Sequence, residues 1–392
     1  MARPPPPPAD DFSLVLGGPL YQLYLRTRLA RPPLHLLRRR MLVLPAIAWL
    51  PLLVLSAIEG VAWSGTKLPF LADIAVHARY LLAIPLLVAA EVVVHERLRP
   101  IVRQFVDEGL VAAADRPRFL AAVDDAQRLR NSPWIEVALL VVALFAGSWL
   151  WRATNTTIGV DTWWTAGGAS NAATWWYAHV SAPLFQFLVL RWYFRLALWW
   201  RLMWRISRLP LALRAAHPDR AGGLGFLRES INGFTLVLMA QSVAVAGVIA
   251  RATQVLGATP MDYASEILVL AVLFLAAVAL PLVFYTGRML DARRLALRDY
   301  DALAAHYVAA FERRWIERRD AADDPQLLGA ADIQSLADLD SSVSIVREMR
   351  PIALDRRSTL LLAIAVLLPY VPLVFTVVSF RDLAKSALGM LL

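Results

Sequence analysis

Seven long apolar runs constrain the fold of this chain more than any other feature. Each run holds about the 20 apolar residues that a helix needs to cross a hydrocarbon layer ~30 Å thick. The runs cover residues 41–58, 79–96, 134–151, 178–198, 231–252, 264–286 and 359–380. We therefore predict an all-α, polytopic membrane protein with about seven transmembrane helices.

The composition agrees with this class. Hydrophobic residues make up 58% of the 392 positions, and charged residues only 18%. Such values are typical of proteins embedded in a bilayer, so the lipid bilayer is the first partner that we predict. Cysteine is absent, which excludes disulfides, thiolate metal sites and cysteine nucleophiles.

Basic residues are distributed unevenly between alternate loops. The Arg-rich segments are 1–40, 98–131, 201–228 and 287–357. On the opposite side, the segments 59–78, 153–177 and 257–263 hold a single Lys or Arg residue, Lys67. Because loops rich in Arg and Lys stay in the cytoplasm, we predict a cytoplasmic N-terminus and an extracytoplasmic C-terminus. The net charge of +9 follows this topology, and we predict no nucleic-acid partner.

The same pattern divides the chain into parts. Residues 1–40 start with a proline run and become basic, so we expect a disordered start and then an interfacial amphipathic helix, with a solvated arm as the alternative. Residues 41–286 form a six-span membrane domain with a helical cytoplasmic loop at 98–131. Residues 287–357 form a cytoplasmic helical segment. Residues 358–392 add a seventh span and a short outer tail.

The sixth run continues into polar sequence without a strong stop signal. An apolar stripe at helical spacing comprises Tyr300, Leu303, Ala304, Tyr307, Val308, Phe311 and Trp315. We predict one helix from 264 to 319, with Tyr300, Tyr307, Phe311 and Trp315 packed against 101–130 or 332–350. Together the inner segments would form a helical cytoplasmic layer.

Five polar side chains fall at membrane depth. They are Glu91, Gln186, Arg191, Arg195 and Gln241. Ionisable groups there are costly and mark ion paths, although Arg also extends to lipid headgroups and amides also join helices. These residues could therefore line an anion path or serve structure alone. Glu91 and Arg191 lie at similar depth, so we predict that Glu91 bonds Arg191 or Arg195.

A Gly-rich turn precedes the fifth run. Its candidate residues are His217, Asp219, Arg220, Gly222, Gly223, Gly225 and Arg228. Glycines before a helix let backbone N–H groups approach an anion. We predict that the turn holds a lipid phosphate, a small anion or an internal carboxylate; the alternative is a tight turn that needs small residues. The motif lacks a Walker Lys and a preceding strand, so it is no P-loop or Rossmann turn.

No catalytic or metal-binding motif is present in the sequence. We therefore predict no cofactor, no metal site and no catalytic residue. A non-enzymatic role is favoured, and an intramembrane enzyme acting on lipid through His217 and Asp219 is the weakest alternative.

Two segments, AHPDRAGGLGFL at 216–227 and ADIQSLADLDSSVSIVREMRP at 331–351, resemble motifs of a widespread bacterial inner-membrane family of unknown activity. The resemblance implies a bacterial inner-membrane location and nothing about substrate. From the polar groups at membrane depth we predict a homo-oligomeric channel or transporter-like protein with an anion bias. The alternative is a membrane scaffold or signalling protein whose cytoplasmic helices bind another protein.

Overall fold

The computed structural model describes residues 12–31, 34–155, 161–165, 171–317 and 331–374. Within these ranges the regular structure is helical and no strand forms, as the all-α prediction requires. The helices are α1 (Pro19–Arg26), α2 (Leu37–Ile58), α3 (Ile74–His77), α4 (Ile84–Asp107), α5 (Arg116–Arg130), α6 (Pro133–Asn155), α7 (Ala172–Trp176), α8 (Ala182–Ser207), α9 (Glu229–Leu256), α10 (Ala264–Val283), α11 (Thr286–Trp315), α12 (Ala331–Arg347), α13 (Arg356–Leu367) and α14 (Val371–Val374).

Five helical stretches in the described residues are long and apolar enough to cross a membrane. They are Leu37–Ile58, Ile74–Asp107, Gly225–Leu256, Pro260–Val283 and Arg356–Leu373. Each coincides with one of the seven predicted runs. The other two runs fall on α6, whose described apolar part is short, and on α8, where Arg191 and Arg195 interrupt the apolar sequence.

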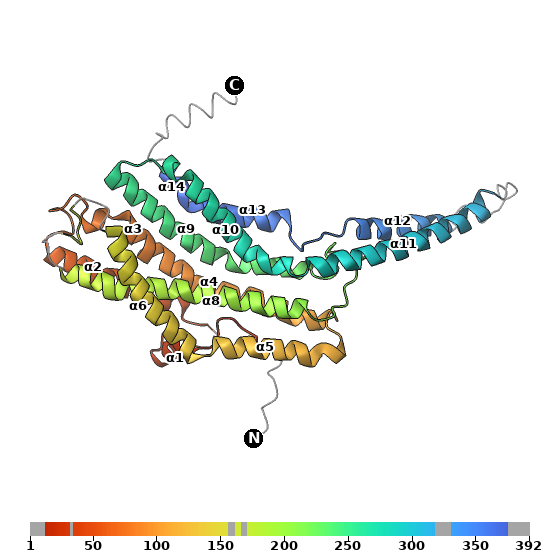
Figure 1. The fold of residues 1–392 in the computed structure, drawn as a ribbon, viewed down its shortest axis with the longest axis horizontal. Helices are drawn as coiled ribbons and strands as arrows, with labels where there is room; N and C mark the ends of the chain where they lie inside the picture. The colour runs from red at the N-terminus through yellow and green to blue at the C-terminus, as the bar shows by residue number, and fades with distance from the viewer. Residues whose placement is uncertain (1–11, 32–33, 156–160, 166–170, 318–330, 375–392) are drawn as a thin grey trace, which may run out of the picture.

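Helix α9 is the centre of the bundle and packs against α4, α3 and α13 (Figure 1). Two glycines let its neighbours approach closely. A Cβ on Gly233 would lie 2.5 Å from Leu98 Cδ1, and a Cβ on Gly247 would lie 2.7 Å from the Cβ of Ala78. Small residues serve the same purpose where helices pack inside membranes. Around this core, α2 packs on α4, and both α5 and α6 pack on α8.

The predicted single helix from 264 to 319 is wrong, because α10 and α11 are separated at Phe284 and Tyr285. Pro281 lies in the last turn of α10 and has no N–H to donate to the carbonyl four residues earlier. That carbonyl, on Ala277, instead accepts the indole N–H of Trp200 at 2.8 Å. Tyr285 is buried and donates its hydroxyl to the Met203 carbonyl of α8 at 3.1 Å.

Helices α11 and α12 form a hairpin that projects away from the bundle (Figure 1). The predicted contact of the stripe with residues 332–350 is confirmed at Asp332. Tyr307 donates its hydroxyl to the Asp332 carbonyl at 3.0 Å, and Trp315 donates its indole N–H to the Asp332 carboxylate at 3.0 Å. Two other residues of the stripe, Leu303 and Val308, are exposed. Residue 319 lies outside the described ranges.

The start of the described chain differs from the expected disordered, interfacial segment. Residues Phe12 to Val15 are buried in the bundle, and Phe12 contacts the ring of Trp199. Helix α1 follows as the expected short amphipathic helix. Arg40, which the sequence placed in a basic interfacial segment, is completely buried within α2. Residues 1–11 lie outside the described ranges.

Candidate functional site

Five charged side chains meet inside the bundle, and each is buried. They are Arg40 on α2, Glu91 on α4, Glu136 on α6, and Arg191 and Arg195 on α8; we call them the ionic cluster. A buried charge is tolerated only when a partner and hydrogen bonds compensate it. The five charges therefore depend on one another for compensation inside the bundle.

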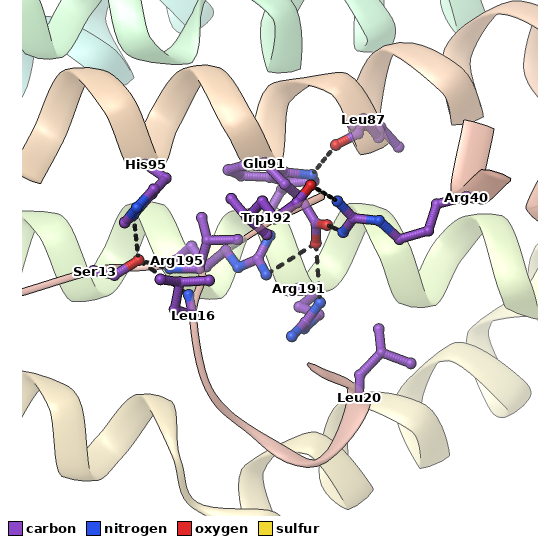
Figure 2. A network of polar contacts seen from close by, with 12 residues as sticks. Ser13, Leu16, Leu20, Arg40, Leu87, Glu91, His95, Arg191, Trp192 and Arg195 are labelled. Carbon is purple, nitrogen blue, oxygen red and sulfur yellow. Dashed lines mark hydrogen bonds and ion pairs between the residues drawn. The ribbon is translucent and has the colours of Figure 1, made fainter. Parts of the chain in front are cut away.

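Glu91 is the centre of the ionic cluster (Figure 2). Its Oε1 accepts hydrogen bonds from Arg191 at 3.3 Å and from Arg195 at 3.1 Å. Its Oε2 accepts a hydrogen bond from Arg40. The predicted bond to Arg191 or Arg195 is confirmed, and both arginines make it. Sequence reasoning missed Arg40, because an Arg next to a predicted span end resembles an ordinary headgroup anchor.

Glu136 is the second acid of the cluster and was also missed. Its Oε1 accepts Arg191 Nε at 3.0 Å. Its Oε2 accepts the backbone N–H of Leu20, in the first turn of α1, at 2.6 Å. An acid in the first turn of a helix usually has a local explanation in the helix dipole, so its position gave no signal of a long-range partner.

The segment before α1 closes the cluster on one side. Arg130 donates to the Ser13 carbonyl, and the Ser13 hydroxyl lies 2.9 Å from His95 Nδ1 (Figure 2). Asn131 accepts the N–H of Gly18 at 3.1 Å. A Cβ on Gly17, at φ +139°, would lie 2.3 Å from the Asn131 Oδ1. Only glycine fits the backbone conformation at position 17, which lets the segment enter the bundle.

The cluster carries three positive and two negative charges. Its charged groups face one another, which is the arrangement that holds helices together. The two amides predicted with them lie outside this network. Gln186 Oε1 and Gln241 Nε2 are buried and have no hydrogen-bond partner among the described residues.

The Gly-rich turn surrounds an internal carboxylate. Asp219 accepts the N–H groups of Ala221 at 2.8 Å, Gly223 at 3.2 Å and Gly225 at 2.8 Å. Burial raises the pKa of Asp219, but these three backbone donors and the adjacent His217 outweigh it, and the pKa lies below the usual value. Of the three anions that the sequence allowed, the structure places the protein's own carboxylate in the turn.

The conformation of the turn requires its glycines. Gly222 has φ +68° and Gly223 has φ +93°, which side chains rarely adopt. A Cβ on Gly225 would lie 2.9 Å from the Asp219 carboxylate. Both Asp219 oxygens are used by backbone donors, and His217 Nδ1 lies 2.9 Å from Oδ1. This pair fixes the turn, which is the structural alternative that the sequence left open.

The turn also contacts the end of the α11–α12 hairpin. Arg220 pairs with Glu348 at 2.9 Å, and its carbonyl accepts the N–H of Arg350 at 2.8 Å. A Cβ on Gly222 would lie 2.8 Å from the buried Met349 Cε. The two sequence segments that carried the family resemblance are therefore in direct contact. Sequence alone gave no sign that they meet, because about 120 residues separate them.

Arg228 lines a small pocket together with Asp219 and also faces the start of α13. Among the described residues, no group of three His, Cys, Asp or Glu side chains comes close enough to hold a metal ion. Comparison with models of known families, with curated proteins and with solved structures gives no match for this chain.

Proposed function

We propose that this chain is a membrane scaffold whose α11–α12 hairpin binds another protein. The hairpin is the observation that carries this proposal. Beyond its base, α11 packs on α12 and leaves the outer side to the surroundings. Exposed apolar side chains along the hairpin are Leu295, Leu303, Val308, Ile316 and Ile333. Exposed apolar side chains on a projecting helical hairpin suit a helical partner.

The charges on the hairpin favour protein over lipid as its partner. Arginines alternate with acids along it, as in the pairs Arg294–Asp291 and Arg347–Asp301. A segment that binds anionic lipid would instead concentrate basic residues. The partner that fits is a protein with an amphipathic helix of mixed charge, including a second copy of this chain.

The base of the hairpin is rigidly attached, as a scaffold requires. Arg288 donates to the carbonyls of Ser207 at 2.8 Å and Arg208 at 3.0 Å. Met289 is buried at the start of α11. The Asp219 turn contacts the other end of the hairpin, after α12, through Met349 and Arg350. Both ends of the hairpin are therefore tied to the bundle, one to α8 and one to the turn.

Seven spans, a cytoplasmic N-terminus, an extracytoplasmic C-terminus and a bacterial inner-membrane location belong to the same proposal. This threading places the hairpin in the cytoplasm, where a partner can reach it. Reporter fusions at the two termini test it, and opposite compartments are expected. Reporters in the same compartment would remove one span.

The anion channel that the sequence also predicts stays a second hypothesis. This hypothesis rests on polar groups at membrane depth, and among them Arg191 and Arg195 both donate to Glu91. Anion flux through liposomes that contain the purified chain tests this hypothesis directly.

Photo-crosslinking tests the scaffold. A photoreactive residue replaces Leu303 on α11 or, as a matched control, the similarly exposed Leu360 on α13. Adducts of defined mass are expected from position 303 only, and Leu295→Glu should weaken them. An adduct of twice the chain mass identifies self-association. The absence of any adduct from 303, together with anion flux through liposomes, would favour the channel.

A further inference from the structure

A polar cleft lies where two candidate spans begin, at the start of α9 and the start of α13. It has a volume of about 760 Å³, and α4 contributes to its wall. Three arginines line it, namely Arg97, Arg228 and Arg357, together with Glu229 and Asp355. We propose that this cleft binds a phosphate-ester anion, and that the phosphate belongs to a lipid headgroup.

The two acids of the cleft are already engaged. Glu229 pairs with Arg97 and also accepts the Asn232 amide at 3.3 Å. Asp355 caps α13 by accepting the Ser358 N–H at 3.3 Å. Burial raises the pKa of Asp355, but its bonds to Ser358 and the nearby Arg228 outweigh this, so its pKa is lowered and it stays ionised.

Two arginines remain free to bind a ligand. Arg228 and Arg357 are exposed and make no hydrogen bond or ion pair with any described residue. Guanidinium groups form paired, charge-assisted bonds with phosphate oxygens. Arg228 also acts on Asp355 through its charge, and Arg97 pairs with Glu229, so the three arginines of the cleft outnumber its two carboxylates and leave a net positive charge for a phosphate.

An apolar strip continues from the cleft and points to a lipid as the source of the phosphate. Leu361 lines the cleft. Ile364 and Leu368 follow at helical spacing, and all three are half exposed along a candidate membrane span. A phosphate held by the arginines at the membrane boundary would let its acyl chains run along this strip.

Native mass spectrometry of the full chain in detergent tests the proposal. Phosphatidylglycerol is titrated against zwitterionic phosphatidylcholine, and inorganic phosphate is added in a separate competition. We expect Arg228→Gln with Arg357→Gln to weaken phosphatidylglycerol binding about 25-fold, since each basic residue at an anionic membrane surface strengthens binding roughly fivefold. Phosphatidylcholine binding should not change.

The single variant Arg228→Gln keeps the test informative if the double variant fails to fold. Its affinity for phosphatidylglycerol should fall roughly fivefold. Arg298→Gln is the matched control, because Arg298 is an exposed arginine of α11 with no described partner. Displacement of the lipid by millimolar inorganic phosphate, with the same dependence on the two arginines, would assign the cleft to free phosphate. Unchanged affinity for both ligands in a folded double variant would overturn the proposal.

Discussion

Two carboxylates of this chain are held in opposite ways. Glu91 is compensated by side chains from α2 and α8, far away in the sequence. Asp219 is compensated by three backbone N–H groups from within the six residues that follow it. The first arrangement joins helices, while the second shapes one loop. Removing the first should therefore destabilise the whole bundle, and removing the second should affect one turn and what it contacts.

The largest effect is expected from Glu91→Gln. The substitution leaves three arginines in the bundle with Glu136 as their remaining acid. Loss of one partner from a buried ion pair typically costs ~3–5 kcal/mol. The free energy of unfolding in detergent measures this loss.

The control for Glu91→Gln is Asp125→Asn. Asp125 also pairs with two arginines, Arg201 and Arg205, but its side chain is 37% exposed. A pair at that exposure contributes below about 1 kcal/mol. Equal losses for Glu91→Gln and Asp125→Asn would show that burial does not distinguish the two carboxylates.

A double-mutant cycle sharpens the assignment of Arg40. Arg40→Gln and Glu91→Gln should each destabilise, and the double variant should lose less than the sum by ~1–3 kcal/mol, because the two groups are in contact. Thermal unfolding in detergent gives the required stabilities. Additive effects would place Arg40 outside the cluster.

Gly17→Ala tests whether the segment before α1 belongs to the cluster. Its Cβ would meet Asn131 in a backbone conformation that favours glycine, so we expect a loss of ~1–3 kcal/mol. Gly109→Ala is the control, since its φ is also positive but nothing lies within 4 Å of the added Cβ. Proteolysis near residue 15 should become faster in Gly17→Ala alone; protection equal to the wild type would contradict this.

A smaller loss is expected from Asp219→Asn, about 1–2 kcal/mol, because an amide nitrogen replaces one acceptor oxygen. The stability of the wild type should also depend on pH through the Asp219 carboxylate, which the variant lacks. The folded pKa of Asp219 is lowered from 3.8. Its stabilisation is therefore fully present above that value and is lost as pH falls through the folded pKa. The stability difference between wild type and variant should shrink below about pH 4. A constant difference would mean that charge is irrelevant.

Much of the fold could be predicted from the sequence because membrane spans and helix caps are local patterns. Apolar runs of sufficient length identified all five candidate spans. The interruption at Phe284 was missed because it depends on Trp200, a side chain from another helix that takes the carbonyl freed by Pro281. The burial of the segment at Phe12 was missed because its partners, Trp199 and His95, are also far away in the sequence.

The same distinction between local patterns and contacts of distant residues applies to the candidate site. For the Gly-rich turn, the glycines predicted an anion surrounded by N–H groups, but the sequence left open whether a lipid phosphate, a small anion or an internal carboxylate such as Asp219 fills it. In the ionic cluster, matching depths along two helices predicted a bond of Glu91 to Arg191 or Arg195. Glu136 lies on a third helix, whose rotation the sequence does not specify.

The smallest effect on stability, and the most informative about function, is expected from Arg220→Gln. Arg220 and Glu348 are each about half exposed, so their ion pair contributes below about 1 kcal/mol. The pair nevertheless links the Asp219 turn to the base of the hairpin. We expect the distance distribution between spin labels at residues 303 and 201 to broaden in Arg220→Gln while the unfolding temperature hardly changes. Glu348→Gln should broaden it equally, because either change removes the same contact. An unchanged distribution in both variants would mean that α8, through Arg288 and Tyr285, fixes the hairpin without help from the turn.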